Sequence, residues 1–126
     1  MNFTVKSVED GKELGRLKEF MLTQPQFYPD YRDWVDGVCI PGISAGNRQA
    51  IIVMSNGAVV GDAVYRGVEG GTEIKNFRID SDYRNRDLGH FLLRQVERES
   101  KGVWSFLMLV LLIFLLLNSG QEMGFI

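Results

Sequence analysis

The chain has 126 residues and a net charge of −2, with 45% hydrophobic and 24% charged residues. This is the length and composition of one globular domain, and it excludes a disordered, collagen-like or disulfide-rich protein. The charge lacks the basic surplus that phosphate contacts need, so we expect no nucleic-acid partner. With one cysteine, Cys39, and one histidine, His90, the sequence offers no internal disulfide, and we expect no metal site.

The two ends of the chain differ in composition. Residues 1–6 contain no basic patch followed by an apolar stretch, so we expect no signal peptide and a cytoplasmic location. Residues 102–126 contain a single charged side chain, and residues 106–117 form an unbroken apolar run. This run is shorter than the ~18 residues of a membrane helix and longer than a typical strand of ~5–6 residues. We expect one domain over residues 1–126, with an atypical apolar segment at 103–117.

The first part of the chain predicts one strand and two helices. Alternation of polar and apolar residues predicts a strand over 2–8. Apolar residues at helical spacing predict an amphipathic helix around 14–21, which Pro25 ends. A short second helix is predicted within 27–38. Residues 41–46, which contain one proline and two glycines, are predicted to form a loop.

The middle of the chain predicts three strands. The runs 49–54 and 58–65 are rich in β-forming residues, and between them lies Asn56-Gly57, a dipeptide favoured in two-residue hairpin turns. A third strand is predicted over 73–80, and an amphipathic helix follows it. The predicted order is β-α-α-β-β-β-α, which favours a sheet with helices packed on it.

Residues 74–96 combine a strand, a short basic turn and the amphipathic helix. Arg84 and Arg86 lie in the turn, and Gly89 lies at the start of the helix. The first turn of a helix presents unpaired N–H groups and a partial positive charge, and a glycine lets a phosphate approach the backbone. Arginines add charge-assisted hydrogen bonds. This pattern predicts an anion-binding site.

The same residues resemble a known family. The run Arg84-Asn85-Arg86-Asp87-Leu88-Gly89 is similar to the Q/R-x-x-G-x-G/A signature of the GNAT acyltransferase superfamily, and the strand before it is similar to the family's lead-in. With the order of elements, the resemblance covers about residues 1–100. It implies an α/β (α+β) fold of the acyl-CoA N-acyltransferase type, with a mixed, mostly antiparallel sheet and helices packed on it. It also implies acetyl-CoA as cofactor and direct transfer of its acetyl group to an amine of a small molecule or a protein.

The resemblance implies which residues hold the cofactor. Main-chain N–H groups of the turn and of the helix start would cradle the pyrophosphate of acetyl-CoA. The edge of the strand at 77–79 would pair with the pantetheine arm. The residues at these positions are Phe77, Arg78, Ile79, Arg84, Asn85, Arg86, Asp87, Leu88, Gly89 and His90.

Three of the polar positions need separate interpretation. Asp87 stands where the signature has its first glycine, and a carboxylate there repels a pyrophosphate, so we expect weakened rather than abolished nucleotide binding. A role of Asp87 as a capping acid of the helix is the alternative. His90 is expected to face solvent or a phosphate rather than to act in catalysis. Cys39 is expected to be a small core residue rather than a nucleophile.

Glu73 is the candidate catalytic residue, because several family members place a glutamate at this strand position as the general base that deprotonates the amine. A solvated glutamate at a strand end is the alternative. In the family the first helices and loops, here about residues 24–48, choose the amine. Tyr28 and Tyr31 could line that pocket or pack in the core, and Tyr65 is a weaker candidate for substrate contact.

The end of the chain departs from the family. The family continues with a fifth strand, a helix and often a tyrosine that acts as general acid, and residues 102–126 match none of these. One hypothesis is a shift of reading frame within 100–106, because plausible codons for 107–126 give a family-like end when read two bases further on. The nucleotide sequence tests this. Residues 104–110 could still form a buried parallel strand, whereas 111–117 would expose an apolar patch.

Three functions are therefore considered. The first is an acetyl-CoA-dependent N-acetyltransferase. The second is a catalytically idle remnant that keeps the fold. The third is a membrane-associated or partner-binding protein that uses 103–117 as its contact surface, and the same segment could hold a homodimer together.

Overall fold

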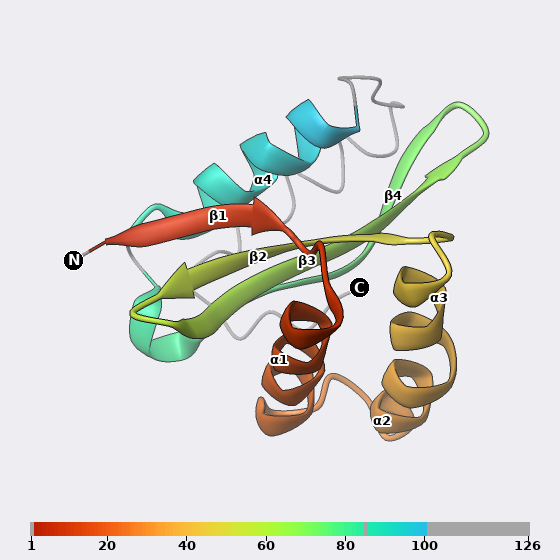
Figure 1. Ribbon diagram of the computed structural model, residues 1–126, viewed down its shortest axis with the longest axis horizontal. Coiled ribbons are helices and arrows are strands. Elements are labelled where there is room, and N and C mark those ends of the chain that lie inside the picture. The colour runs from red at the N-terminus through yellow and green to blue at the C-terminus, as the bar shows by residue number, and fades with distance from the viewer. Residues whose placement is uncertain (1, 85, 101–126) are drawn as a thin grey trace.

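The structure is a computed structural model that describes residues 2–84 and 86–100. These residues form a four-stranded sheet in the order β1-β2-β3-β4, and its three strand pairings are all antiparallel (Figure 1). The strands are β1 (Phe3–Ser7), β2 (Gln49–Ser55), β3 (Ala58–Val68) and β4 (Gly71–Ile79). Strands were predicted at all four places. The β3–β4 hairpin extends further than predicted, because its two strands stay paired as far as Val68 and Gly71.

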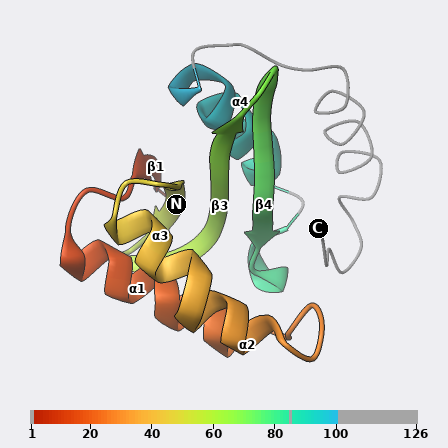
Figure 2. The same cartoon turned by 90° about the vertical axis from the view of Figure 1, so that its right-hand side faces the viewer.

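Helices cover both faces of the sheet (Figures 1 and 2). On one face lie α1 (Gly11–Thr23), α2 (Tyr31–Trp34) and α3 (Ile40–Ser44), and on the other lies α4 (Leu88–Glu99). We call these the α1–α3 face and the α4 face. The predicted architecture, an antiparallel sheet with helices packed on it, is confirmed.

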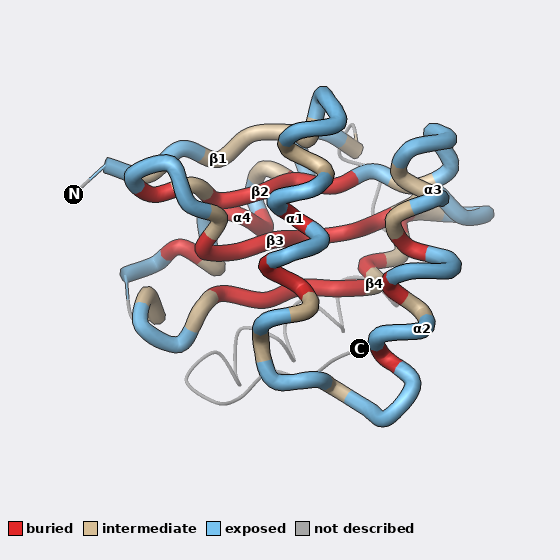
Figure 3. The backbone as a smooth tube through the Cα atoms, turned by 60° about the horizontal axis from the view of Figure 1, so that its bottom comes forward, coloured by how far each residue is buried: buried red, intermediate tan, exposed pale blue. Residues whose placement is uncertain are grey.

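The two faces have separate apolar cores, so the middle of the sheet is buried on both sides (Figure 3). The α4 core joins one stripe of that helix to the inner strands, and the stripe consists of Leu88, Leu92, Leu93 and Val96. The α1–α3 core contains Leu17, Met21, Tyr31, Val35, Cys39, Ala50, Ile52 and Val64. The prediction that Cys39 is a core residue is confirmed, and its burial raises the pKa of the thiol to about 12.

The turn between β2 and β3 has the predicted geometry. Asn56 and Gly57 both have positive φ values, 52° and 83°. A two-residue turn with positive φ at both positions matches the twist of the strands that it joins, and asparagine and glycine are the residues that tolerate it best. The Asn-Gly pair therefore fixes the hairpin that places β3 in the centre of the sheet.

The predicted loop at 41–46 is wrong, because most of this segment is helical. Helix α2 continues through a π-helical turn (Val35–Cys39) directly into α3. The backbone N–H of Ile40 bonds to the carbonyl of Val35, five residues back. This wider turn stands just before Pro41, which has no N–H to donate and whose ring would crowd a regular helix. Proline is tolerated here because it falls in the first turn of α3.

Strand β4 contains a β-bulge at Lys75. Val64 pairs with Asn76 and Tyr65 pairs with Ile74, so Lys75 has no partner of its own. Because a bulge inserts one residue, it reverses the faces of the strand beyond it. Ile74 and Phe77 therefore both pack in the α4 core, although they are three residues apart.

The predictions for residues 101–126, including the apolar segment, its parallel strand and the shift of reading frame, lie outside the described residues. Within the ranges that the structure describes, no helix is long and apolar enough to cross a membrane.

Candidate functional site

The connection from β4 to α4 begins with a short turn held by its own hydrogen bonds. A 3₁₀ turn (Ser81–Tyr83) follows Asp80, whose carboxylate accepts a bond from the backbone N–H of Asp82 at 2.9 Å. Arg84 Nε donates to the carbonyl oxygen of Ile79 at 3.1 Å. The chain is thus turned back beside the end of β4 before α4 starts.

The first amides of α4 lie ahead of the helix's internal hydrogen bonds. The N–H of Phe91 donates to the carbonyl of Asp87 at 3.1 Å, and the amides of Leu88, Gly89 and His90 come before it. Asp87 occupies the N-cap position of α4, but its side chain makes no capping hydrogen bond with the described residues. An acid at this position can still interact with the helix dipole, so the alternative of a capping acid stays open. Such amides, with the positive end of the helix dipole, suit an anion.

Asp87 itself has a left-handed backbone conformation, with φ = 58°. Residues with a side chain adopt this region at an energetic disadvantage, and aspartate tolerates it better than most. This left-handed conformation is a physical reason for the glycine that the signature has at this position. The aspartate that replaces it directly precedes the open amides in the chain.

Gly89 is not required by the packing of the described residues. A Cβ atom built on Gly89 would lie 3.8 Å from Cε1 of Phe77, which is an ordinary van der Waals contact, and would meet nothing else among the described residues. An alanine would therefore fit. What the glycine provides is open backbone at the start of α4.

The predicted cofactor residues lie along the end of β4, the connection after it and the start of α4, and they differ in exposure. His90 and Arg86 are exposed, as predicted for an anion site. The Arg86 guanidinium lies 5.6 Å from the centroid of the Tyr83 ring. Asn85 lies outside the described residues.

Within 77–79 the side chains point to opposite faces. Phe77 and Ile79 are part of the α4 core. Arg78 is buried on the α1–α3 face, and its guanidinium lies 3.7 Å from the centroid of the Phe27 ring. The side chain of Arg78 therefore does not face the turn before α4, and any role of 77–79 in holding the cofactor belongs to the main chain.

Glu73 takes part in a cross-strand ion pair. Arg66 Nε donates to Glu73 Oε1 at 2.8 Å, and Lys75 Nζ lies 3.8 Å from the other carboxylate oxygen. The hydrogen bond from Arg66 holds the pKa of Glu73 below its usual value. Glu73 lies six residues before Ile79, roughly 20 Å along the strand. Its role as general base stays a prediction.

Of the three tyrosines predicted to contact substrate, Tyr28 and Tyr31 contact each other, and Tyr65 lies apart from them. Tyr31 is 1% exposed in the α1–α3 core, so the alternative of core packing is confirmed for it. Tyr28 is 45% exposed, and its ring meets that of Tyr31 edge-on with 5.5 Å between centroids. Tyr65 lies on the other side of the sheet in the α4 core, where burial raises its pKa to about 12. Only Tyr28 presents a surface that a substrate could reach.

A buried polar cluster was missed by the sequence analysis. Asp62 and Asn76 lie side by side on the α1–α3 face, and Asn76 Nδ2 donates to both carboxylate oxygens of Asp62, at 3.1 and 2.8 Å. Burial raises the pKa of Asp62 to about 7, although the bond from Asn76 and the charge of Arg78 oppose the shift. A signal was present, because an acid in the middle of an apolar strand needs a partner.

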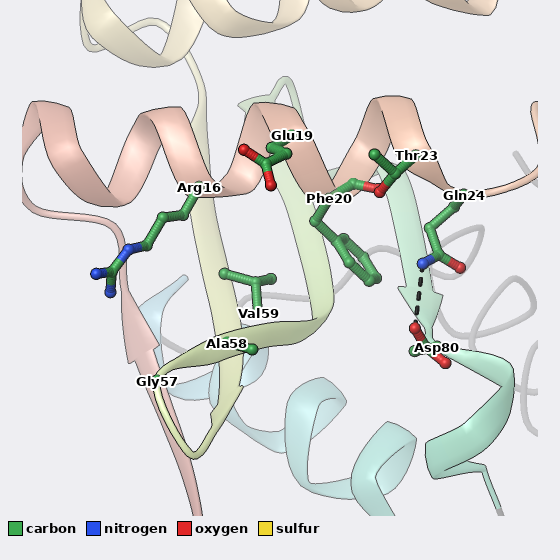
Figure 4. Close-up of a pocket in the computed structure, with 9 residues that line it drawn as sticks. All are labelled: Arg16, Glu19, Phe20, Thr23, Gln24, Gly57, Ala58, Val59 and Asp80. Atoms are coloured by element: carbon green, nitrogen blue, oxygen red, sulfur yellow. Dashed lines mark hydrogen bonds between the residues drawn. The ribbon is translucent and has the colours of Figure 1, made fainter.

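A polar groove lies on the α1–α3 face, between α1 and the β2–β3 turn (Figure 4). Arg16 and Glu19 line it from α1, and Gln24, which follows this helix, donates from Nε2 to Asp80 Oδ2 at 3.2 Å. None of the predicted site residues lines this groove. The groove nevertheless reaches the start of the connection from β4 to α4, because Asp80 lines it.

The sheet, its two helical layers and the open start of α4 directly after β4 together make the fold of acyl-CoA N-acyltransferases. A family model described as the acetyltransferase (GNAT) family matches residues 14–111. The chain belongs to the GNAT acetyltransferase family, and the predicted family and fold are confirmed. No match is found among curated proteins.

Solved structures share this fold at low sequence identity. A GNAT-family protein from Desulfovibrio desulfuricans matches with a TM-score of 0.65 and 14% identity, over 79% of this chain and 67% of that chain. The PaiA N-acetyltransferase of Thermoplasma acidophilum, solved in complex with coenzyme A, matches with a TM-score of 0.60 and 13% identity, over 82% and 76% of the two chains. AAC(6')-Iy, solved with the bisubstrate analog CoA-S-monomethyl-acetylneamine, matches with a TM-score of 0.63 and 16% identity, over 100% and 95%.

Proposed function

We propose that this chain is an N-acetyltransferase that uses acetyl-CoA and transfers the acetyl group to a primary amine by direct attack. In this reaction the amine nitrogen bonds to the thioester carbon, the carbon–sulfur bond breaks, and the proton lost by the amine passes to a base while the thiolate of coenzyme A leaves. The acceptor is an amine of a small molecule or of a protein.

The observation that carries the proposal is the start of α4. The amides of Leu88, Gly89 and His90 stand ahead of the helix's own hydrogen bonds, and no side chain of Asp87 caps them. A diphosphate is an anion of the kind that such a helix start binds. The relatives solved with coenzyme A or with a coenzyme A analog support the same cofactor.

The remaining roles extend this proposal. Residues 77–79 would pair with the pantetheine arm through their main chain, and Glu73 would take the proton of the amine. The hydrogen bond from Arg66 supports Glu73 in the ionised form that a base requires. Tyr28, which is exposed beside α2, would contact the acceptor. A cytoplasmic location belongs to the same proposal.

Two measurements on the full chain test the function. Calorimetry with acetyl-CoA is expected to detect saturable binding, and absence of heat at millimolar cofactor would remove the proposal. Release of coenzyme A thiol is then followed with spermidine, neamine, a lysine peptide and a peptide with an amino-terminal alanine. Thiol release that depends on one of these amines supports the transferase, whereas cofactor binding with no turnover of any amine supports the idle remnant.

A further inference from the structure

A hydrogen-bonded chain of three buried side chains connects the centre of the sheet to α2. The hydroxyl of Tyr31 donates to Asn76 Oδ1 at 2.8 Å, and Asn76 Nδ2 donates to both oxygens of Asp62 at 3.1 and 2.8 Å. Asp62 is 0% exposed, and the other two are 1% exposed. A carboxylate in the middle of β3 thus reaches the first residue of α2 through a single amide.

A second connection runs beside the first. Arg78 stands directly opposite Asp62 in the pairing of β3 and β4, and both are buried. The Arg78 guanidinium lies 3.7 Å from the centroid of the Phe27 ring, and that ring meets Tyr31 edge-on with 5.2 Å between centroids. Two oppositely charged side chains of the sheet therefore hold two neighbouring aromatic residues of the 27–34 segment.

This arrangement does more than bury apolar area. Buried charges and amides are expensive to desolvate, and apolar side chains of similar volume would often hold a helix as well or better. A satisfied polar network instead permits only one arrangement of its donors and acceptors. The segment fixed in this way, 27–34, carries the exposed ring of Tyr28 and lies within the region that we expect to contact the acceptor.

This inference rests on the proposed acetyl transfer. We propose that Asp62 is a positioning residue which, through Asn76 and Tyr31, fixes the 27–34 segment against β4 and so determines the affinity for the acceptor amine. Helix α4 packs on the opposite face of the sheet, and none of the residues at its start takes part in the network. Loss of the network is therefore expected to change acceptor KM much more than kcat or the affinity for acetyl-CoA.

Exchanging the two polar partners gives the sharpest test. Asn76→Asp places two buried carboxylates face to face, which removes the donor that Asp62 needs. The double variant D62N/N76D restores one amide and one carboxylate in contact, and residue 76 can still accept from Tyr31. For whichever amine in the panel above is turned over, N76D is expected to raise acceptor KM about tenfold or more, with the double variant within about threefold of the wild type.

Hydrogen exchange of the full chain provides a readout that does not depend on activity. Peptides covering 27–39 are expected to lose protection in N76D and to regain it in the double variant, while peptides from α4 are unchanged. Ser55→Ala is the matched control, because it removes another buried polar atom, one that makes no hydrogen bond with the described residues. If N76D does not fold, Tyr31→Phe takes its place, since it removes one donor and keeps the ring.

The outcomes separate the two proposals. Three results would overturn the positioning role. They are additive effects of D62N and N76D, no recovery in the double variant, and a loss of affinity for acetyl-CoA instead of for the acceptor. If acetyl-CoA binds but no amine is turned over, the proposed transferase activity fails, and the exchange pattern of 27–39 alone decides whether Asp62 fixes that segment.

Discussion

The side chain of Ile79, at the end of β4, lies directly over the bare backbone of Gly61 on β3. A Cβ atom built on Gly61 would stand 2.7 Å from Cδ1 of Ile79 and 3.1 Å from the carbonyl oxygen of Arg78. The two residues are also partners in the strand pairing. Gly61 thus lets β4 approach β3 closely at the point where the chain leaves the sheet for the candidate cofactor surface.

Replacing Gly61 is therefore expected to destabilise the fold. Gly61→Ala should lower the free energy of unfolding by about 1–3 kcal/mol, because the added methyl group forces Ile79 or the β4 backbone to move. Urea unfolding measures the change. Gly67→Ala, in the same strand, is the control, because a Cβ at Gly67 would meet nothing within 4 Å. Equal stability of the two variants would contradict the close approach.

Removing the charge of Asp87 is expected to strengthen cofactor binding. Asp87→Asn keeps the size of the side chain and its tolerance of positive φ, but it removes a carboxylate beside the open amides of α4. Relief of like-charge repulsion predicts acetyl-CoA binding about threefold to tenfold tighter. Calorimetry measures it. Asp36→Asn is the control: it removes a charge on the opposite face of the sheet and should leave the affinity for acetyl-CoA unchanged. If the affinity is unchanged in D87N as well, the pyrophosphate does not bind beside Asp87.

A substitution of Gly89 is expected to affect the stability of the fold and the affinity for acetyl-CoA in opposite directions. Gly89→Ala is expected to keep or raise stability, by up to about 1 kcal/mol, since alanine is the better helix former. Its methyl group would obstruct the approach of a phosphate, so acetyl-CoA affinity should fall about tenfold or more. Gly15→Ala in α1, where a Cβ would meet nothing within 4 Å, should change stability alone. Retention of full affinity in G89A would count against binding at this helix start.

The buried carboxylate of Asp62 predicts a pH dependence of stability. Its pKa is raised by burial from 3.8 to about 7, so the folded state keeps a proton that unfolding releases between these values. The free energy of unfolding should therefore fall as pH rises through this window, with a slope of at most about 1.4 kcal/mol per pH unit. Urea unfolding at several pH values measures it. Asp62→Asn should flatten the curve, and parallel curves for the two proteins would refute the assignment.

Glu73 can be tested against its ion-pair role. If it takes the amine proton, Glu73→Gln should lower kcat by about 10²-fold or more. Arg66→Ala should move the acid limb of the pH–rate profile to higher pH, because it removes the hydrogen bond that holds the pKa of Glu73 down. Glu69→Gln, at the tip of the same hairpin, is the matched control. An unchanged kcat in E73Q would show that Glu73 is not the general base and that its role is the ion pair with Arg66.

The strands were predictable because their signals are local, and the candidate anion site stays a prediction that rests on a signal of the same local kind. Asn56-Gly57 marks a two-residue turn by backbone conformation alone, and the basic turn before Gly89 lies within one stretch of sequence. The helix that contains Pro41 was missed because the proline is accommodated by the widened π-helical turn before it, for which the sequence has no simple local signal. The hydrogen bonds of Asn76 with Tyr31 and with Asp62 join residues 45 and 14 positions apart, and no spacing rule brings such residues together.

The bulge at Lys75 makes β4 sensitive to length rather than to composition at that position. Deleting Lys75 would turn over the part of the strand that follows it. Phe77 and Ile79 would then be driven among the helices of the α1–α3 face, and the charge of Arg78 would enter the apolar layer beneath α4. The single bulged residue thus determines which face of the sheet receives the apolar side chains of the end of β4 and which receives its charged side chain.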